Sequence, residues 1–203
     1  MTIIDKHQLL PRLADSERVE LELGCGNRKR DKSWIGIDAL DFDDVDLVGD
    51  VFEVLAQFRD GSVDAVHAFH FFEHVADLPA LLKELARVLK KDGALEVVVP
   101  HFSNPYFYSD YTHKQFFGLY SFSYLADDAI MKRRVPQYIP TTAFRLSEVD
   151  LNFKSSPPFY VRHGFKKMLG ALFNLNNYMR ELYEENYSAL FPCYEIRFLL
   201  RRK

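Results

Sequence analysis

Short apolar runs that end in Gly, Asp or Pro recur through the first half of the chain. Residues 18–23 alternate between polar and apolar positions, and further β-rich runs follow at 34–38, 45–48, 63–69 and 95–99. Runs of this length, bounded by turn residues, are typical of β-strands. We therefore predict five strands before residue 101.

One segment between these runs has helical periodicity. Residues 78–90 place apolar side chains three and four positions apart and end at Asp92-Gly93, which predicts a helix followed by a turn. Strands that alternate with helical segments favour an α/β fold with a mostly parallel sheet. Only residues 27–33 separate the first two strands, which is too short for a full crossover helix, so the first helix is predicted to have a turn or two at most.

The second half of the chain has a different pattern. Residues 101–144 are rich in His, Phe, Tyr, Ser and Asp, with a helix expected from 114 to 125. Two further strands are predicted at 145–153 and 194–200, separated by a mostly helical insertion over 165–190. No repeat or linker divides the chain, so we predict one domain over residues 1–203.

Composition places the chain among ordinary globular proteins. It has 203 residues, 48% hydrophobic and 27% charged, with a formal net charge of −3. This charge offers no general attraction for nucleic acid. Two cysteines, Cys25 and Cys193, do not suggest a disulfide framework, and neither a signal peptide nor a stretch long enough to span a membrane is recognised. We expect a cytoplasmic protein without a membrane span.

Glycines and acids stand at the ends of the first three predicted strands. Gly24-Cys25-Gly26 follows the first strand, Asp38 ends the second, and Asp50 follows the third. Glycines let the backbone approach a ligand, a carboxylate can accept both hydroxyls of a ribose, and a second acid can accept a purine amino group. Ligands of open α/β sheets bind at these carboxyl ends. The ordered set predicts a nucleoside site.

Longer segments around these residues resemble the class I S-adenosylmethionine (SAM)-dependent methyltransferases. Residues 22–26 (Glu-Leu-Gly-Cys-Gly) match the first motif of that family, Asp38 its ribose-binding acid, and residues 49–51 (Gly-Asp-Val) its adenine-side motif. Residues 63–77 and 85–95 are similar to segments of its small-molecule members, often called type 11. The resemblance implies a seven-stranded, mostly parallel, doubly wound Rossmann-like sheet, here with a shortened first helix and helical insertions.

The resemblance also implies SAM as cofactor, S-adenosylhomocysteine (SAH) as product, and a cofactor site in residues 1–100. The predicted cofactor-binding residues are Glu22, Gly24, Cys25, Gly26, Asn27, Arg28, Asp38, Ala39, Asp50, Val51, Phe69 and His70. Many members of the family have a third glycine where this chain has Arg28. We therefore expect Arg28 or Lys29 to reach the methionine carboxylate of SAM or the substrate. A dinucleotide site fits poorly, because Lys29 occupies the last glycine position of its motif.

Residues 101–113 leave the fifth strand, and in the resembled architecture this exit borders the methyl group. We expect residues 101–144 to form a substrate loop or lid, and 145–203 to supply the last strands. Asp110 could orient His113, whose neutral imidazole could then take a proton from a hydroxyl group. Alternatively, Asp110 caps a helix that begins near Thr112, and both roles can hold. His101 is the next candidate base, and the predicted substrate contacts are His74, Tyr106, Tyr108 and Tyr111.

Two other patterns point elsewhere. Residues 70–74 (His-Phe-Phe-Glu-His) match the His-x-x-Glu-His pattern of inverted zinc peptidases, but the pattern begins at a strand exit and the clearest helix starts later. Residues 104–107 (Asn-Pro-Tyr-Phe) partly match a loop of amine methyltransferases, but they follow the fifth strand instead of the fourth. We predict no metal site, with His101, Asp110 and His113 as the alternative ligand set.

The most favoured function is methyl transfer to the oxygen of a small polar acceptor, with a sugar or nucleotide-linked sugar of a surface-glycan pathway as candidate. An N-methyltransferase acting on a small amine is the first alternative. A binding module that keeps the cofactor fold without catalysis is the second. The insertion at 165–190 is expected either to cover the active site or to form a homodimer contact.

Overall fold

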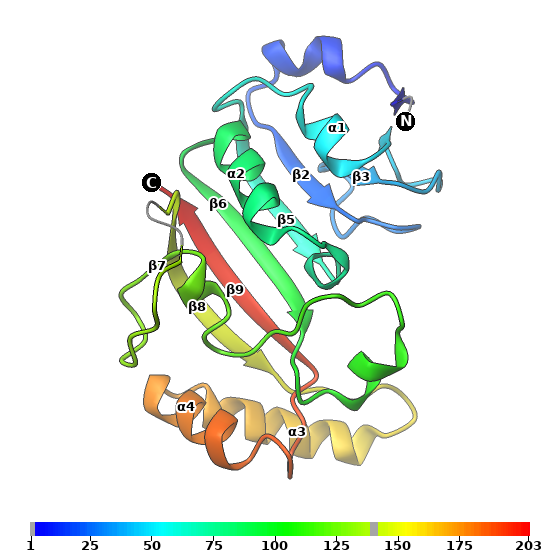
Figure 1. Ribbon diagram of the computed structural model, residues 1–203. Helices are drawn as coiled ribbons and strands as arrows, with labels where there is room; N and C mark the ends of the chain where they lie inside the picture. The colour runs from blue at the N-terminus through cyan, green and yellow to red at the C-terminus, as the bar shows by residue number, and fades with distance from the viewer. Residues whose placement is uncertain (1–2, 139–141) are drawn as a thin grey trace.

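A computed structural model describes residues 3–138 and 142–203 (Figure 1). In these ranges nine strands form one sheet in the order β1-β4-β3-β2-β5-β6-β9-β8-β7. The strands are β1 (Ile4–Asp5), β2 (Glu20–Leu23), β3 (Ile35–Asp38), β4 (Leu47–Val48), β5 (Val63–Phe69), β6 (Leu89–Pro100), β7 (Asp127–Asp128), β8 (Phe144–Asn152) and β9 (Glu195–Arg202).

The helices are fewer and are spread unevenly along the chain. The α-helices are α1 (Val51–Leu55), α2 (Leu78–Val88), α3 (Tyr160–Phe173) and α4 (Asn177–Asn186), and the 3-10 helices are η1 (Leu10–Asp15), η2 (Phe72–His74), η3 (Pro105–Ser109) and η4 (Phe122–Tyr124). Helices α1 and α2 lie together on one side of the sheet, whereas α3 and α4 pack beside β8 (Figure 1). No helix in the described ranges is long and apolar enough to cross a membrane.

The sheet confirms the predicted α/β class. Strands β4, β3, β2, β5 and β6 run parallel, and β9 is antiparallel between β6 and β8. The predicted seven strands correspond to all but the two-residue edge strands β1 and β7, which are too short to show a period in the sequence. The chain leaves β2 toward β3 on one side and β5 lies on the other, so the strand order reverses at β2, where open α/β sheets bind their ligands.

Local sequence explains the best predicted elements. Asp77 caps α2 by accepting a hydrogen bond from the backbone of Ala80, and Leu81 and Leu85 on its inner face are fully buried. Strand β5 has the predicted bounds. The helical insertion is also present, although α3 starts at Tyr160 and a break separates it from α4.

The helix predicted at 114–125 is wrong, since only the short η4 forms there. The backbone of this segment is held by distant parts of the chain. The amide groups of Lys114 and Gln115 donate to the carbonyl oxygen of Glu73. The carbonyl oxygen of Phe117 accepts a hydrogen bond from the amide of Phe102. Phe117 is buried in the core, and these contacts replace the local bonds of a helix.

Residues 27–33 contain turns and no helix. The ammonium group of Lys29 is buried and lies 2.6 Å from Oδ2 of Asp46, while it also donates to the carbonyl oxygen of Trp34. The same Asp46 oxygen accepts from the amide of Gly36. Lys29 therefore ties the short connection to the sheet, which leaves it no freedom to reach a ligand as the sequence analysis proposed.

Aromatic side chains cover the sheet where a longer crossover would otherwise supply a helix. The ring of Trp34 stacks on His67 of β5 with centroids 3.8 Å apart, and the guanidinium of Arg30 lies 4.4 Å from the ring centre of Phe69. His67 and Phe69 are two residues apart and so share one face of β5. The side chains of the short connection thus cover this face of β5 without a helix.

A charged network on the same face makes stability depend on pH. Nδ1 of His67 lies 3.0 Å from Oε2 of Glu96, and Nε of Arg197 donates to Oε1. The hydrogen bond from His67 and the charge of Arg197 outweigh burial and lower the pKa of Glu96 from 4.5 to about 2. Ionised Glu96 therefore stabilises the fold above pH 4.5, and this contribution is lost as the pH falls toward 2.

We expect the free energy of unfolding to drop more steeply between pH 4.5 and 2 in the wild type than in Glu96→Gln, by about 2 kcal/mol over that window. Urea unfolding at a series of pH values measures this difference. The control Glu17→Gln removes an exposed carboxylate and should follow the wild type. Parallel curves for Glu96→Gln and the wild type would show that Glu96 has no such role.

Candidate functional site

The glycine turn and Asp38 meet at the carboxyl ends of β2 and β3. Gly24 and Gly26 have φ angles of +65° and +58°, and a Cβ atom on Gly24 would lie 2.6 Å from Cδ2 of Phe71. Oδ2 of Asp38 accepts a hydrogen bond from the amide of Gly26, and Oδ1 accepts one from Leu40. A carboxylate has about four acceptor positions, so one on each oxygen remains for a pair of hydroxyl groups.

Asp50 stands at the next strand end along this edge. Its Oδ1 accepts hydrogen bonds from the amides of Phe52 and Glu53, which caps the start of α1. Oδ2 is left to accept from a ligand. Val51, in the first turn of that helix, is half-buried. The structure therefore holds Asp50 in a fixed orientation at the predicted adenine side.

Glu22 is almost fully buried beneath the glycine turn. Its Oε2 accepts a hydrogen bond of 2.7 Å from the amide of Arg30, and burial raises the pKa of its carboxyl group. Arg30 in turn lies over Phe69. The predicted Arg28 and Asn27 are exposed at the rim of the turn, as is Ala39 after β3. The sequence analysis did not name Arg30, which contacts two predicted site residues, Glu22 and Phe69.

His70 leaves β5 with a φ angle of +55°. Its Nε2 lies 3.0 Å from Oε2 of Glu195, and its Nδ1 lies 3.3 Å from Oε1 of Glu73. Burial alone would lower the pKa of His70, but the two carboxylates outweigh it and raise the pKa to about 9. The positive charge that this favours at neutral pH holds together the ends of β5 and β9.

The predicted base His113 lies among polar groups near the surface. Its Nδ1 lies 2.9 Å from the carbonyl oxygen of Phe107, and its ring centre is 4.9 Å from that of His74. Asp110 lies 3.6 Å from Nε2 of His113 and caps no helix, because its Oδ1 accepts from the amide and hydroxyl of Thr112 in a local turn. His74, His113 and Asp110 therefore lie close together in the structure.

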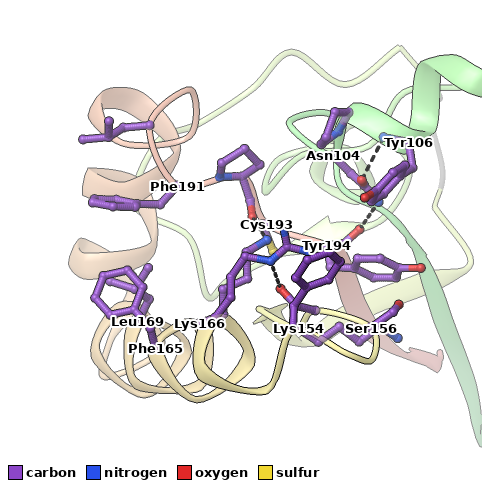
Figure 2. Close-up of a pocket in the computed structure, with 16 residues that line it drawn as sticks. Asn104, Tyr106, Lys154, Ser156, Phe165, Lys166, Leu169, Phe191, Cys193 and Tyr194 are labelled. Atoms are coloured by element: carbon purple, nitrogen blue, oxygen red, sulfur yellow. Dashed lines mark hydrogen bonds between the residues drawn. The ribbon is translucent and has the colours of Figure 1, made fainter.

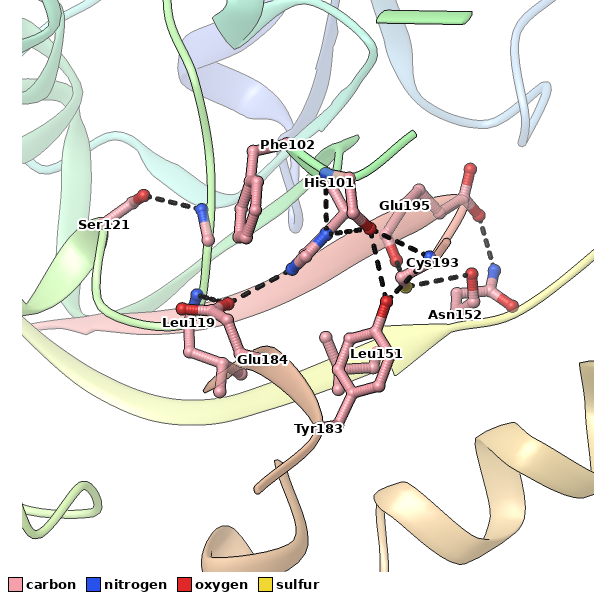
Figure 3. A network of polar contacts seen from close by, with 12 residues as sticks. His101, Phe102, Leu119, Ser121, Leu151, Asn152, Tyr183, Glu184, Cys193 and Glu195 are labelled. Atoms are coloured by element: carbon pink, nitrogen blue, oxygen red, sulfur yellow. Dashed lines mark hydrogen bonds and ion pairs between the residues drawn. The ribbon is translucent and has the colours of Figure 1, made fainter. Parts of the chain in front are cut away.

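His101 does not join this cluster. Figure 3 shows it inside a buried network, where Nδ1 lies 2.8 Å from Oγ of Ser103 and Nε2 lies 3.1 Å from Oε2 of Glu184. Its side chain is fully buried. The hydroxyl of Tyr183 contacts the same Ser103. With both ring nitrogens engaged, His101 ties the loop after β6 to α4, and this arrangement disfavours it as a base and as a metal ligand with His113.

A pocket of 380 Å³ opens on the other side of η3 (Figure 2). Its walls come from the loop after β6, the residues after β8, helix α3 and the segment before β9. The lining residues are Asn104, Pro105, Tyr106, Lys154, Ser155, Ser156, Phe159, Arg162, Phe165, Lys166, Leu169, Leu190, Phe191, Pro192, Cys193 and Tyr194. The lining contains three cationic side chains and no carboxylate.

Neighbouring groups hold all three of these cations, and Arg162 donates to Oγ of Ser155 and lies over the ring of Phe159. Lys154 lies 2.7 Å from Oε2 of Glu195 and 4.5 Å from the ring centre of Tyr194. Lys166 donates to the carbonyl oxygen of Pro192, and burial lowers its pKa. Since Glu195 also pairs with His70, this pocket adjoins the carboxyl end of β5.

The predicted substrate tyrosines lie in different places. Tyr106 lines the pocket, whereas the hydroxyl of Tyr108 donates to the carbonyl oxygen of Phe102. Tyr111 is 96% exposed and contacts neither the pocket nor the histidines in any described interaction. Cys25 is buried, and burial raises its pKa to about 12, so it packs beneath the turn and does not react as a thiolate.

The sequence analysis missed the residues that α3 and the loop before it bring to the site. Lys166 belongs to the predicted helical insertion, whereas Lys154 and Arg162 lie between that insertion and the strand predicted at 145–153. A signal was present, since these cations recur at spacings of eight and four residues among aromatic side chains. Leu40, exposed directly beside Asp38, was a second signal of an apolar ligand surface.

Comparisons with known proteins agree with this geometry. Residues 21–97 match the family model described as a methyltransferase domain. A search of curated proteins finds no match. Among solved structures, a SAM-dependent methyltransferase from Archaeoglobus fulgidus is similar, with a TM-score of 0.57 and 17% identity over 96% of this chain and 93% of that one.

Two bacterial structures show the same fold. The YcgJ protein from Bacillus subtilis has a TM-score of 0.51 and 17% identity over 97% of this chain and 98% of that one. A putative methyltransferase from Bacillus halodurans has a TM-score of 0.50 and 16% identity over 96% and 98%. Together with the family match, these findings confirm the resemblance predicted from residues 22–26, Asp38 and residues 49–51.

Proposed function

We propose that this chain transfers a methyl group from SAM to an oxygen of a small polar, anionic acceptor. The proposal rests on the class I methyltransferase fold and on the match of residues 21–97 to a methyltransferase domain. The observation that carries the acceptor class is the pocket that Lys154 and Glu195 connect to His70, with three cations and no carboxylate in its lining. A nucleotide-linked or phosphorylated sugar combines the hydroxyl, the anion and the apolar surface that such a pocket suits.

The cofactor is proposed to lie across the carboxyl ends of β2, β3 and β4. Asp38 accepts the two ribose hydroxyls with its remaining acceptor positions, and Asp50 accepts from the adenine amino group with Oδ2. The glycine turn allows the backbone to approach the methionine part, and Glu22 offers a carboxylate to its ammonium group. These roles use the lone pairs that the fold leaves unoccupied.

The acceptor hydroxyl is proposed to approach the methyl group from the cluster of His74, His113 and Asp110. Its oxygen attacks the methyl carbon, the carbon–sulfur bond breaks with its electron pair on sulfur, and SAH leaves as a neutral thioether. The proton of the hydroxyl passes toward His113. Holding the three atoms in line is worth up to about 7–11 kcal/mol, and proton removal adds about 10²–10⁴-fold.

The direct test incubates the protein with SAM and a panel of nucleotide sugars, sugar phosphates, neutral sugars and small amines. Mass analysis should show a 14 Da gain on an anionic, hydroxyl-bearing member together with formation of SAH. A gain only on an amine would support the alternative N-methyltransferase. Binding of SAM without product from any member would favour the non-catalytic module.

Replacing Lys166 with methionine should raise the KM of an anionic acceptor about tenfold with little change in kcat, because a cation that binds the acceptor at a distance from the methyl contributes about 1.5 kcal/mol to binding. The matched control is Lys167→Met, on the next residue of α3, which is exposed and bonds to Asn152 outside this pocket. Steady-state kinetics of both variants make the comparison. Equal KM values would show that the pocket does not bind the anion.

A further inference from the structure

Glu73 is a buried carboxylate that lies beside His70 and that the proposed cofactor site does not use. It lies on η2, shortly after β5, in the His-x-x-Glu-His segment. Its side chain is fully buried, and neither carboxylate oxygen has a hydrogen-bond partner in the described part of the chain. His70 forms an ion pair with Oε1 at 3.3 Å, without hydrogen-bond geometry, so in the described residues Oε2 has neither a hydrogen bond nor an ion pair.

An ionised carboxylate without hydrogen bonds is costly to bury, and such groups are paired or coordinate metals. Two histidines lie beside it. One ligand atom each from Glu73, His74 and His113 come within 4.8 Å of one another. Ligands of a tetrahedral zinc ion stand about 3.4 Å apart, so small side-chain rotations would close the set around an ion.

The hydrogen bonds of both imidazoles prepare them for coordination. Thr112 donates its hydroxyl hydrogen to Asp110, so the contact of 2.9 Å between its Oγ1 and Nδ1 of His74 requires a hydrogen on that nitrogen. Nδ1 of His113 faces the carbonyl oxygen of Phe107, which can only accept. With the hydrogen placed on Nδ1 in both rings, Nε2 is the nitrogen that can bind a metal ion. Metal-binding histidines use this arrangement, donating their second N–H to an oxygen.

We propose that Glu73, His74 and His113 bind a divalent transition-metal ion, with Zn²⁺ as the best match to two imidazoles and one carboxylate. Asp110, 3.6 Å from Nε2 of His113 and partly exposed, stands where a fourth ligand or a proton acceptor is needed. His74 and Asp110 reach the surface, so an ion can enter.

The inference rests on the proposed function and changes how His113 acts in it. An acceptor hydroxyl bound to the ion loses its proton to Asp110 or to solvent, because the cation lowers the pKa of a bound oxygen. The metal-bound oxygen then attacks the methyl carbon as described above. His113 becomes a ligand in place of a free base, and a metal is added to a site for which the sequence predicted none.

The test titrates untagged, chelator-treated protein with ZnCl2 in the calorimeter. One ion should bind per chain, and His74→Ala should weaken its binding about 100-fold or more. Glu73→Gln is the second variant, since it keeps the volume and removes the charge of the ligand. His7→Ala, which removes an exposed histidine elsewhere, should bind like the wild type. Cobalt substitution adds a visible absorption band that depends on the same residues.

Three outcomes separate the inference from the proposed function. Zinc binding that disappears in His74→Ala and Glu73→Gln, with turnover restored by added metal after chelation, supports both. No binding, or binding that both variants keep, overturns the metal site. If chelated protein then still binds SAM and turns over fully, methyl transfer stands and His113 acts as a free base. Titration of the chelated protein with SAM measures cofactor binding independently of the metal.

Discussion

Replacing Asp38 with alanine is expected to weaken the binding of SAM about 100-fold. The carboxylate offers one free acceptor position on each oxygen, and two hydrogen bonds from ribose hydroxyls to a charged group contribute about 3 kcal/mol together. Asp38 also accepts from the amides of Gly26 and Leu40, so its loss loosens the glycine turn that the cofactor must contact. Calorimetric titration with SAM measures the effect.

The matched control is Asp43→Ala, which removes an exposed carboxylate from the loop after the same strand. It should bind SAM like the wild type. Asp38→Asn keeps an acceptor oxygen for part of this network and should fall between the two. Wild-type affinity in Asp38→Ala, in protein with an unchanged melting temperature, would contradict the position assigned to the ribose.

Replacing His113 with alanine is expected to lower kcat by about 10²–10⁴-fold while the affinity for SAM changes less than about twofold. The imidazole is held by the carbonyl oxygen of Phe107 and leaves Nε2 for the acceptor proton or for a metal ion, and either role acts on the chemical step. It lies after η3, away from Asp38 and the glycine turn. Single-turnover kinetics with SAM in excess isolates this step.

His163→Ala is the control for His113→Ala, because His163 on α3 hydrogen-bonds to Ser155 in the loop before that helix and is outside the cluster. It should retain wild-type turnover. A His113→Ala protein that is folded, binds SAM and turns over at the wild-type rate would remove His113 from the reaction in both of its proposed roles.

The parts of the fold that depend on local sequence could be predicted. Strand β5 and helix α2 follow from apolar spacing and from turn residues such as Asp77, because each segment carries its own periodicity. The carboxyl-end motifs could be placed for the same reason, since Asp38 ends its strand and Asp50 lies two residues after the next one. The helix expected at 114–125 failed because Glu73, about 40 residues earlier, takes the backbone hydrogen bonds of Lys114 and Gln115.

The acceptor side could be predicted only in part. His74, Asp110 and His113 were named one by one, but their meeting with a buried Glu73 depends on how the loop after β6 folds back. His101 has the same chemistry in sequence, yet the fold buries it against Glu184. The cationic pocket is assembled from α3 and from two loops that lie 90 residues apart in the sequence, as the hydrogen bond between Asn104 and Tyr194 shows.

The amino-acid end of the cofactor site is where this chain departs most from the pattern it resembles. The connection over residues 27–33 has no helix, and buried Lys29 fastens it to Asp46. The side chain of Arg30 packs over Phe69, and its backbone amide donates a hydrogen bond to Glu22, whereas Arg28 is exposed. The sequence indicated that this region was short, but not which of its three neighbouring cations would be buried, stacked or free.

The central claim is that the edge formed by the glycine turn, Asp38 and Asp50 binds SAM. Isothermal titration of the wild-type protein with SAM, and separately with SAH, tests it most directly. We expect one site per chain for each ligand, with both titrations weakened in Asp38→Ala and unchanged in Asp43→Ala. Absence of heat and of any thermal stabilisation with both ligands would contradict the assignment of this edge as a methyl-donor site.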